Sequence, residues 1–409
     1  MTNRDLFHAT MRRENGDMLL HVEQAFNVPY KVWKKDGLPD DIAAAWMPSL
    51  SVNKSLYDHF NVTGFMWDMR FDQFCVPKHP ERILCDDGKT VTYVNTLGNT
   101  MVGISQQIQT ERDDGAMIGS PPHEVDFLIK TPNDYMDNRF RFVGNISERY
   151  DAGNLTAESD AYRTQPDYIT AVWVHGPFAF LREILGTENA MVLPYEEPEM
   201  IRLMLKDHLE TAMAAAEFVI KSIQPDITYI WEDCCGGSGP FIAPSMFDEM
   251  FADWYRAWKD YTFSMGVPWT VLDTDGDPLP LVRRWYDNGI DLILPWEVNG
   301  VDMLSFAEDF PQYNMLGGIY KHMFEPGDIA QTGRFKSADV HQSIDDELRR
   351  VVKPMRKRGG YFPSLDHAAF WGVTYDGYRY YSDQLREKYG KANTVQRHSC
   401  CTALYQRYY

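Results

Sequence analysis

From about residue 168 onward, the chain alternates between two kinds of hydrophobic pattern. Short apolar runs bounded by turn residues are typical of buried strands, whereas apolar positions that recur every three to four residues over a longer segment are typical of helices. We predict strands at 169–174, 227–231, 268–272, 291–295, 313–316 and 360–363. We predict helices at 197–223, 245–265, 279–288, 303–310, 338–358 and 375–389.

This alternation predicts an α/β fold with a parallel sheet and right-handed crossovers. The strand–helix units of this part, with earlier strands to supply two more, favour a (β/α)8 TIM barrel over an open sheet. A dinucleotide-binding sheet is disfavoured, because no G-x-G-x-x-G segment follows any of the predicted strands.

The first 150 residues are less regular. A helix is predicted at 4–13 and a strand at 18–22, and Asp86-Asp87-Gly88-Lys89 separates two β-like runs within 83–94, which indicates a hairpin. We therefore expect a β-rich elaboration that packs on the main domain. The predicted organisation is an N-terminal segment with this hairpin elaboration (1–150), the main part of the barrel (151–392) and a tail (393–409).

The net charge disfavours several classes of partner, and the cysteine spacing disfavours a zinc knuckle or a disulfide framework. The 59 acidic residues outnumber the 40 basic ones and give a net charge of -19. This balance disfavours nucleic acid and anionic membrane surfaces, which both need a basic face. The six cysteines show no C-x-x-C spacing. The sequence has neither the apolar core of a signal peptide nor an apolar run of membrane-spanning length, and we expect a cytoplasmic protein.

Polar residues follow almost every predicted strand. In a (β/α)8 barrel the carboxyl ends of the strands surround one cavity, so these side chains are expected to converge. One such residue would be weak support for a site, but several strands supply carboxylate or imidazole independently. The residues concerned are His175, Glu232, Asp233, Asp273, Asp275, Asp277, Glu297, Lys321, His322, Asp366 and His367.

A group of carboxylates with histidine allows two kinds of chemistry. It can bind a divalent cation such as zinc. It can also keep a proton on one carboxyl group whose pKa is raised by its neighbours, which makes a general acid. We assign either role to Asp273, Asp275 and His367. Structural roles are the alternatives elsewhere: Asp277, which precedes Pro278, could cap the next helix, and Trp231 and Trp296 could be core or the wall of an aromatic pocket.

The chain resembles a known superfamily at these positions. The segments that carry the resemblance are Trp173–Phe178, Trp231–Asp233, Leu272–Asp277, Pro295–Val298, Leu316–Ile319 and Gly359–His367. They are similar to the uroporphyrinogen decarboxylase superfamily, and most of all to its branch of cobalamin-linked methyltransferases. The resemblance covers most of the chain from residue 170 onward and implies a TIM barrel.

Two departures from the superfamily pattern narrow what the resemblance implies. The decarboxylases carry an arginine-rich N-terminal signature, whereas residues 25–41 offer three lysines and no arginine. The methylcobalamin:thiol methyltransferases bind zinc through a His-x-Cys pair and a later cysteine. Asp273 and Asp275 occupy the positions of that pair, and no cysteine lies near Leu365. An oxygen-rich zinc site that includes His367 is still conceivable, and otherwise the carboxylates work without metal.

The resemblance thus implies a methyltransferase that moves a methyl group from a small methylated substrate, an aryl methyl ether, to the cob(I)alamin of a separate corrinoid protein. The partner must supply the cobalamin, because the chain lacks an Asp-x-His-x-x-Gly cobalamin signature. The alternatives are a uroporphyrinogen-decarboxylase-like lyase and a non-catalytic barrel that binds an aromatic or corrinoid ligand. Beside the catalytic group Asp273, Asp275 and His367, the substrate contacts are assigned to Trp231, Glu232, Tyr229, Trp296, Glu297 and His175.

Overall fold

The structure is a computed structural model of the 409-residue chain. It describes residues 1–24, 30–42, 54–68, 71–105, 122–150, 159–160, 162–164, 166–298, 301–325, 339–369 and 372–390. The predicted tail at 393–409 lies outside the described residues.

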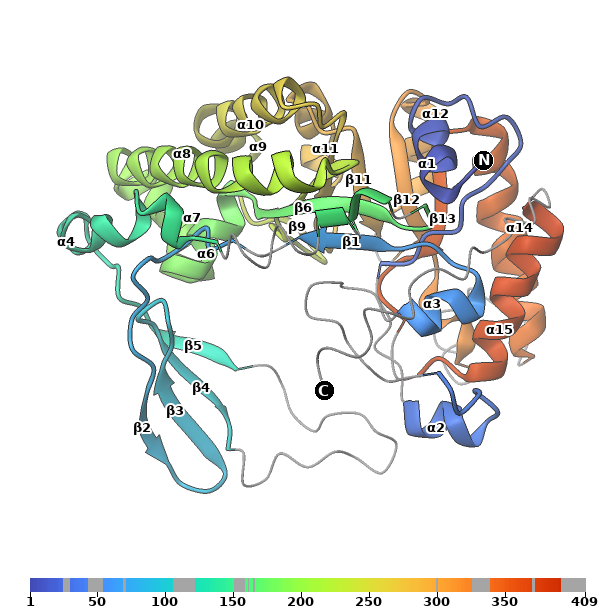
Figure 1. Ribbon diagram of the computed structural model, residues 1–409, viewed down its shortest axis with the longest axis horizontal. Coiled ribbons are helices and arrows are strands. Elements are labelled where there is room, and N and C mark those ends of the chain that lie inside the picture. Colours follow the sequence, from blue (N-terminus) through green and yellow to red (C-terminus); the bar gives the residue numbers. More distant parts are fainter. Residues whose placement is uncertain are drawn as a thin grey trace.

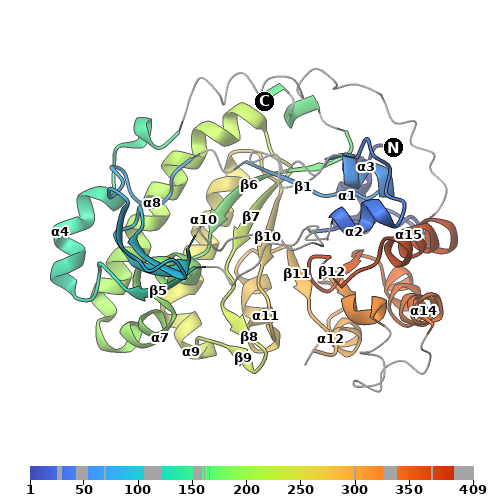
Figure 2. The same cartoon turned by 90° about the horizontal axis from the view of Figure 1, so that it is seen from below.

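A curled, seven-stranded parallel sheet forms the centre of the molecule (Figures 1 and 2). All six strands predicted in the second part of the chain are present, with ends shifted by a few residues, and β1 was not predicted. The sheet order is β1 (Phe65–Asp68), β6 (Ile169–His175), β7 (Ile227–Trp231), β10 (Trp269–Asp273), β11 (Leu292–Trp296), β12 (Asn314–Ile319) and β13 (Tyr361–Leu365).

A short N-terminal segment connects the two edges of this sheet. The backbone N–H of Val22 donates to the carbonyl of Pro363 in β13 at 3.2 Å, and that of Glu23 donates to the carbonyl of Thr63, just before β1, at 2.8 Å. The predicted strand at 18–22 is thereby reduced to a single bridge between Val22 and Thr63. The sheet fits a TIM-like α/β fold, and a fully closed eight-stranded barrel stays a prediction.

Alternate residues of the strands form an apolar interior. Helix α1 (Asn3–Met11) contributes Leu6, Phe7 and Met11 to this cluster, and the ring of Phe7 stacks on that of Phe362 with centroids 5.1 Å apart. Burial of a large apolar side chain stabilises a fold by roughly 1.5–3 kcal/mol. The helix predicted at 4–13 is thus confirmed, and its amphipathic face covers the interior of the sheet.

Helices cover the outer side of the curved sheet. Figure 2 shows α8, α10 and α11 along the strands. The predicted helix at 245–265 is divided by a π-helical turn, and α6 and α7 were not predicted. The helices are α6 (Pro177–Leu185), α7 (Thr187–Glu196), α8 (Pro198–Ile223), α9 (Pro244–Met246), η2 (Phe247–Phe251), α10 (Ala252–Ser264), α11 (Leu279–Asp287), α12 (Met303–Asp309), α14 (Val340–Arg358) and α15 (Tyr375–Gln384).

Shorter elements complete the described chain. They are α2 (Tyr30–Lys35), α3 (Lys54–Phe60), α4 (Pro132–Phe142), η1 (Ile146–Glu148), η3 (Lys321–Phe324), η4 (Leu385–Tyr389) and a two-stranded ladder of β8 (Cys235–Gly236) and β9 (Gly239–Pro240). Within the described ranges, no helix combines the length and apolar character that crossing a lipid bilayer requires.

The predicted hairpin is part of a larger antiparallel sheet that projects from the body of the molecule (Figure 1). The side-chain amide of Asn99 donates to the carbonyl of Glu183 at 2.9 Å and ties this sheet to α6. This antiparallel sheet follows β1 in the chain, so it starts from the carboxyl end of the main-sheet strands, where the polar residues lie. Its strands, in order, are β2 (Arg82–Asp86), β3 (Thr90–Val94), β4 (Thr100–Ile104) and β5 (His123–Asp126).

Candidate functional site

Asp273 ends strand β10, and its carboxyl group is turned into the sheet interior. Its Oδ2 accepts hydrogen bonds from the hydroxyl of Tyr229 at 2.7 Å and from the side-chain amide of Gln24 at 3.0 Å. Burial, with a smaller contribution from the charge of Asp275, raises the pKa of Asp273 to about 8, although the hydrogen bond from Tyr229 opposes the shift. At neutral pH this carboxyl group therefore carries a proton.

The position of Asp273 follows from the alternation of its strand. Val271 belongs to the interior cluster, so Asp273, two residues on, lies on the same side of the sheet. Its carbonyl accepts the backbone N–H groups of Glu232 at 2.9 Å and Asp233 at 3.2 Å, which fix the end of β10 against the segment after β7. Gln24, which the sequence reasoning missed, arrives from the segment that bridges the sheet edges.

Asp275 and His367 form a second, more open pair. Nε2 of His367 lies 3.5 Å from Oδ2 of Asp275, and the two side chains are 36% and 42% exposed. The hydrogen bond to Asp275 raises the pKa of His367, and partial burial opposes that rise. His367 is thus held in its protonated form to higher pH than an isolated histidine.

A tight turn sets Asp275 apart from Asp273. Gly276 has φ +78°, and a Cβ there would lie 2.5 Å from the carbonyl oxygen of Gly236, so only glycine fits without a shift of the backbone. The N–H of Gly276 donates to Oε2 of Glu297 at 2.9 Å. Asp277 accepts the N–H of Leu279 at 3.0 Å, in agreement with its helix-capping alternative. Glu297 therefore holds this turn in place.

Aromatic side chains cluster at the ends of β6 and β7. The rings of Trp173 and Trp231 stack with centroids 6.0 Å apart, and His175 meets them edge-on at 4.5 and 5.0 Å. Burial lowers the pKa of His175 well below its usual range, so its ring is neutral. The guanidinium of Arg182 lies 4.8 Å from the centroid of Trp231 and is held by Asp233 at 2.7 Å.

Two of the predicted substrate contacts lie in the packing beneath the site. Glu232 is fully buried, and its Oε1 accepts the N–H of Phe178 at 3.0 Å. Burial raises the pKa of Glu232 to about 8. A Cβ on Gly176 would lie 1.4 Å from Oε2 of Glu232, so this glycine makes room for the carboxyl group. Trp296 is also fully buried, with its ring 5.1 Å from that of Phe306 in α12.

The three tentative metal ligands do not converge on one point. Asp273 is turned toward Tyr229 and Gln24, whereas His367 faces Asp275. In the part of the chain that the structure describes, no three His, Cys, Asp or Glu side chains are grouped closely enough to hold a metal ion. This arrangement does not fit a preformed zinc centre, and zinc stays a prediction from the sequence.

Asp366, the buried neighbour of His367, ties two loops together. Its Oδ1 accepts the N–H of Lys321 at 2.9 Å, and its Oδ2 accepts that of Val298 at 3.2 Å. Burial raises the pKa of Asp366 to about 6. The residue therefore positions the loop that carries His367.

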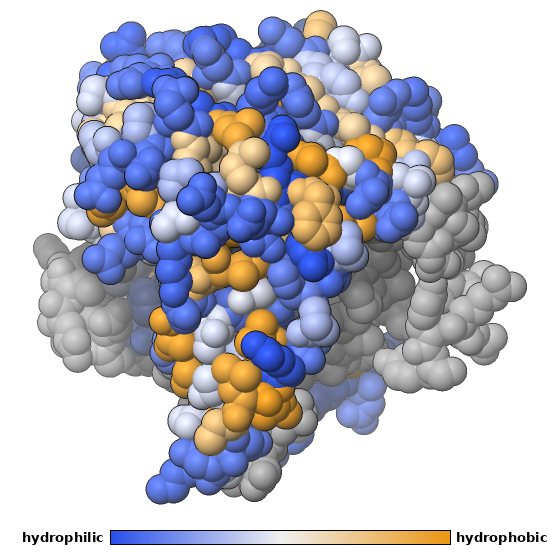
Figure 3. Space-filling view, turned by 90° about the vertical axis from the view of Figure 1, so that its left-hand side faces the viewer, coloured by the Kyte–Doolittle hydropathy of each residue, from blue (hydrophilic) through white to orange (hydrophobic). Residues whose placement is uncertain are grey.

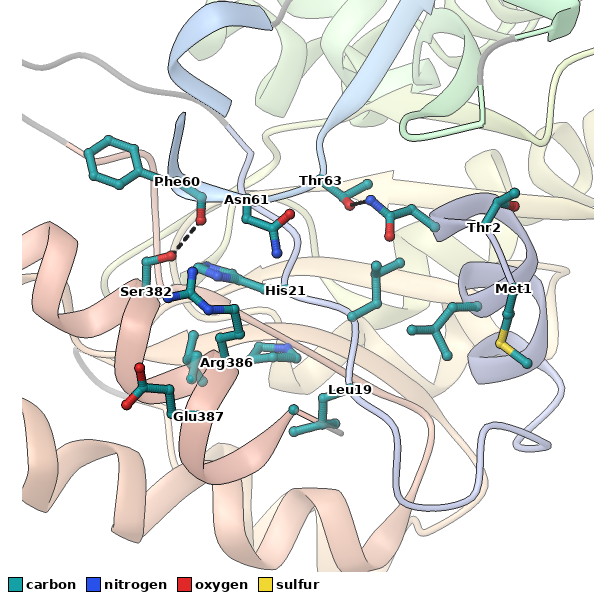
Figure 4. A pocket seen from close by; sticks show the side chains of 16 residues that line it. Met1, Thr2, Leu19, His21, Phe60, Asn61, Thr63, Ser382, Arg386 and Glu387 are labelled. Atoms are coloured by element: carbon teal, nitrogen blue, oxygen red, sulfur yellow. Dashed lines mark hydrogen bonds between the residues drawn. The ribbon is translucent and has the colours of Figure 1, made fainter. Parts of the chain in front are cut away.

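A separate cavity of about 530 Å³ lies between α1, the His21 segment and the end of α15 (Figure 4). His21 lines it, and its Nε2 lies 2.7 Å from Oε1 of the buried Glu23. Since Leu20 and Val22 belong to the interior cluster, His21 and Glu23 point to the outer, helical side of the sheet. None of the described residues that line this cavity belongs to the group around Asp273.

Comparison with known proteins places this geometry in a wider context. No protein-family model and no curated protein matches the chain. Among solved structures, it is similar to a methyltransferase from Methanosarcina mazei, with a TM-score of 0.61 over 95% of this chain and 99% of that one. The likeness shows the fold. At 11% sequence identity it shows nothing finer than a shared fold.

Proposed function

We propose that the chain is a methyltransferase that moves a methyl group from an aryl methyl ether to the cob(I)alamin of a separate corrinoid protein. One observation carries the proposal: a carboxyl group that keeps its proton at neutral pH, Asp273, stands at the carboxyl end of a central strand beside an aromatic wall. The sequence resemblance and the fold shared with a methyltransferase support the same reaction class.

The ether oxygen is the difficult centre of this reaction, because an alkoxide or phenolate leaves poorly unless it is protonated. Asp273 donates its proton to the ether oxygen as the carbon–oxygen bond breaks, and the product leaves as the phenol. Cob(I)alamin presented by the partner would supply the electron pair that accepts the methyl group, so the methyl group would move as a cation equivalent and the charges would balance. Asp273 is left as a carboxylate, which Tyr229 and Gln24 stabilise by donating to Oδ2.

The aromatic wall gives the substrate ring a place to stack. Trp231 is half-buried and lies against Trp173, with the neutral ring of His175 edge-on to both. Offset or edge-to-face packing of aromatic rings is worth roughly 0.5–1.5 kcal/mol beyond the area buried. His367, held beside Asp275, orients the polar substituents of the ring.

The pH dependence of the chemical step should report the ionisation of Asp273. The proton donor is competent below its pKa and lost above it, so the rate is expected to be level on the acid side of about pH 8. Above that value it should fall about tenfold per pH unit, since only the protonated fraction reacts. Single-turnover formation of methylcob(III)alamin, followed by absorbance between pH 6 and 10, measures this decrease, the alkaline limb of the pH–rate profile. A rate that rises through this range would contradict the assignment.

The two hydrogen-bond donors to Oδ2 of Asp273, Gln24 and Tyr229, should determine the pH at which the rate begins to fall. Both stabilise the carboxylate form, so Gln24→Ala or Tyr229→Phe is expected to raise the pKa of Asp273 and move the alkaline limb to higher pH. A hydrogen bond worth about 0.5–1.5 kcal/mol corresponds to a shift of up to roughly one pH unit. Gln342→Ala, on the exposed face of α14, is the matched control and should leave the limb in place. An unchanged limb in both site variants would show that these contacts are only structural.

The decisive experiment for the proposal is an anaerobic absorbance assay. Purified protein, reduced corrinoid carrier or free cob(I)alamin, and a panel of methoxybenzenes are combined, and the appearance of methylcob(III)alamin is followed with matched measurement of the phenol. Equal amounts of both products would establish the reaction. Silence with methoxybenzenes, methylamines and thioethers alike would overturn it, and turnover of uroporphyrinogen instead would establish the lyase alternative.

A further inference from the structure

Two consecutive cysteines, Cys234 and Cys235, follow strand β7 at the edge of the site. Both are buried and free, and their sulfur atoms lie 3.9 Å apart. Successive side chains of an extended chain point to opposite faces, so adjacent thiols do not ordinarily meet. Here the chain turns just before the pair, because Asp233 has φ +42°, in the left-handed region that residues other than glycine rarely adopt. The two thiols come together directly after this turn.

The cysteine pair packs against the turn that carries Asp275. The N–H of Cys234 donates to Oγ1 of Thr274 at 3.2 Å. The carbonyl of Gly236, the residue after the pair, accepts the N–H of Asp277 at 3.0 Å. Since these contacts join the pair to both sides of Asp275, a change in the backbone of the pair is transmitted to that turn.

A short ladder links the pair to the surface. Cys235 belongs to β8, which forms only two residue pairs with β9, and both strands lie at the lower margin of Figure 2. Gly237 and Ser238 at the tip of the ladder are exposed. So short a ladder opens locally at a small cost in free energy. Burial raises the pKa of the Cys234 thiol, so this thiol stays protonated while the ladder is closed and becomes reactive when it opens.

We propose that Cys234 and Cys235 form a redox-active dithiol, which hydrogen peroxide oxidises to a disulfide and glutathione reduces again. The sulfur of Cys235, at 4% exposed the nearer to solvent, attacks the peroxide. The O–O bond breaks, which gives a sulfenic acid and one molecule of water. The sulfur of Cys234 then displaces the hydroxyl group as a second water and forms the S–S bond. The two sulfur atoms thus supply the two electrons that reduce the peroxide.

A disulfide between adjacent residues is strained and therefore reversible. Consecutive Cα atoms lie about 3.8 Å apart across a trans peptide, which is below the range of about 4.4–6.8 Å that disulfides favour. Strained disulfides are reduced more readily than structural ones. Two molecules of glutathione return the two electrons and leave as their own disulfide. Because ring closure must shift the backbone of the pair, oxidation should also loosen the hydrogen bond from Asp277 to Gly236.

Peptide mass spectrometry of the full chain tests the pair. After brief exposure to hydrogen peroxide and alkylation of the remaining thiols, the tryptic peptide 222–256 should have lost two hydrogen atoms and gained no alkyl group. Treatment with glutathione before alkylation should restore two alkylated cysteines. The peptide holds no other cysteine, so the second adjacent pair, Cys400 and Cys401, does not contribute to the signal. Phenylarsine oxide, which bridges neighbouring thiols, should protect Cys234 and Cys235 from alkylation in the reduced chain.

Three variants separate the steps. Cys234→Ser should leave Cys235 as a sulfenic acid that dimedone traps, because the partner thiol is missing. Cys235→Ser should leave Cys234 unreacted at the same dose of peroxide. Cys85→Ser is the matched control, since Cys85 is exposed on β2 of the projecting sheet, whose hydrophobic surface Figure 3 shows. Its replacement should not change the oxidation of the pair.

Hydrogen exchange measures the effect on the turn. The amide of Asp277 should lose protection when the pair is oxidised and regain it with glutathione, whatever reaction the chain catalyses. Three results would overturn the proposal: peroxide that modifies Cys85 and leaves both buried thiols reduced, oxidation of the pair to sulfinic acid without a disulfide, or a disulfide that glutathione does not reduce. Unchanged exchange at Asp277 would contradict the link to the turn.

Discussion

Replacement of Asp273 by asparagine is expected to lower the rate of methyl transfer from a methoxybenzene by about 10²–10⁴-fold, the usual contribution of a general acid. The asparagine side chain keeps the shape and can still accept the hydrogen bonds of Tyr229 and Gln24, so the fold should be retained. What is lost is the proton that burial keeps on the carboxyl group. Single-turnover formation of methylcob(III)alamin measures the effect.

The leaving group separates acid catalysis from damage to the site. A methyl ether of a strongly acidic phenol needs little protonation, so the Asp273→Asn defect should shrink for methyl nitrophenyl ether and stay large for unsubstituted methoxybenzene. Asp260→Asn, exposed on α10, is the matched control and should react like the wild type. Equal losses for both ethers would show that Asp273 positions the substrate and does not protonate it.

The second large effect concerns stability and involves Glu23. This carboxyl group is fully buried and accepts hydrogen bonds from His21 at 2.7 Å, from the hydroxyls of Ser364 and Tyr381 at 3.1 Å each, and from the N–H of Leu365 at 3.3 Å. Glu23→Ala leaves these donors unpaired inside the protein. We expect it to lower the free energy of unfolding by about 3–5 kcal/mol, as when one partner of a buried polar pair is removed. Urea unfolding followed by tryptophan fluorescence measures this.

Two further variants serve as comparisons for the unfolding of Glu23→Ala. Glu23→Gln keeps an acceptor oxygen and should cost less than the alanine variant, because part of the network survives. Glu210→Ala, at an exposed position of α8, should change the free energy of unfolding by no more than about 0.5 kcal/mol. A loss of less than about 1 kcal/mol for Glu23→Ala would mean that water replaces the carboxylate between β1 and β13. The N-terminal segment that connects these two strands would then not depend on Glu23.

The strands could be predicted because burial on both faces gives each one a continuous apolar run. Val271 and Leu272 show this, since one faces the interior and the other the helices. The four-residue strand β1 escaped prediction because so short a run has no distinctive pattern. The elaboration was predicted to be β-rich, but only its hairpin could be located, because just its first turn carries a clear Asp-Gly signal.

The site was predictable to the extent that it lies at strand ends. Tyr229 and Asp273 were both assigned to it, and they are hydrogen-bonded to each other. Glu232 was assigned to the cavity although it follows Trp231 directly, and strand alternation turns neighbouring side chains to opposite faces. Gln24 had no local signal, since it meets Asp273 from 249 positions away in the chain. Only the three-dimensional path of the N-terminal segment brings these two residues together.

The bridge at Val22 has a consequence for the order of folding. The N–H of Val22 also donates to the carbonyl of Pro363, and these two residues lie far apart in the sequence. Contacts so far apart in sequence form late, because the loop between them must close first. Gln24, two residues from this bridge, can therefore reach Asp273 only after β13 has docked. The hydrogen bond from Gln24 to Asp273 and the docking of β13 then form together. In a chain that stops before β13, the pKa of Asp273 would lack the contribution of this hydrogen bond.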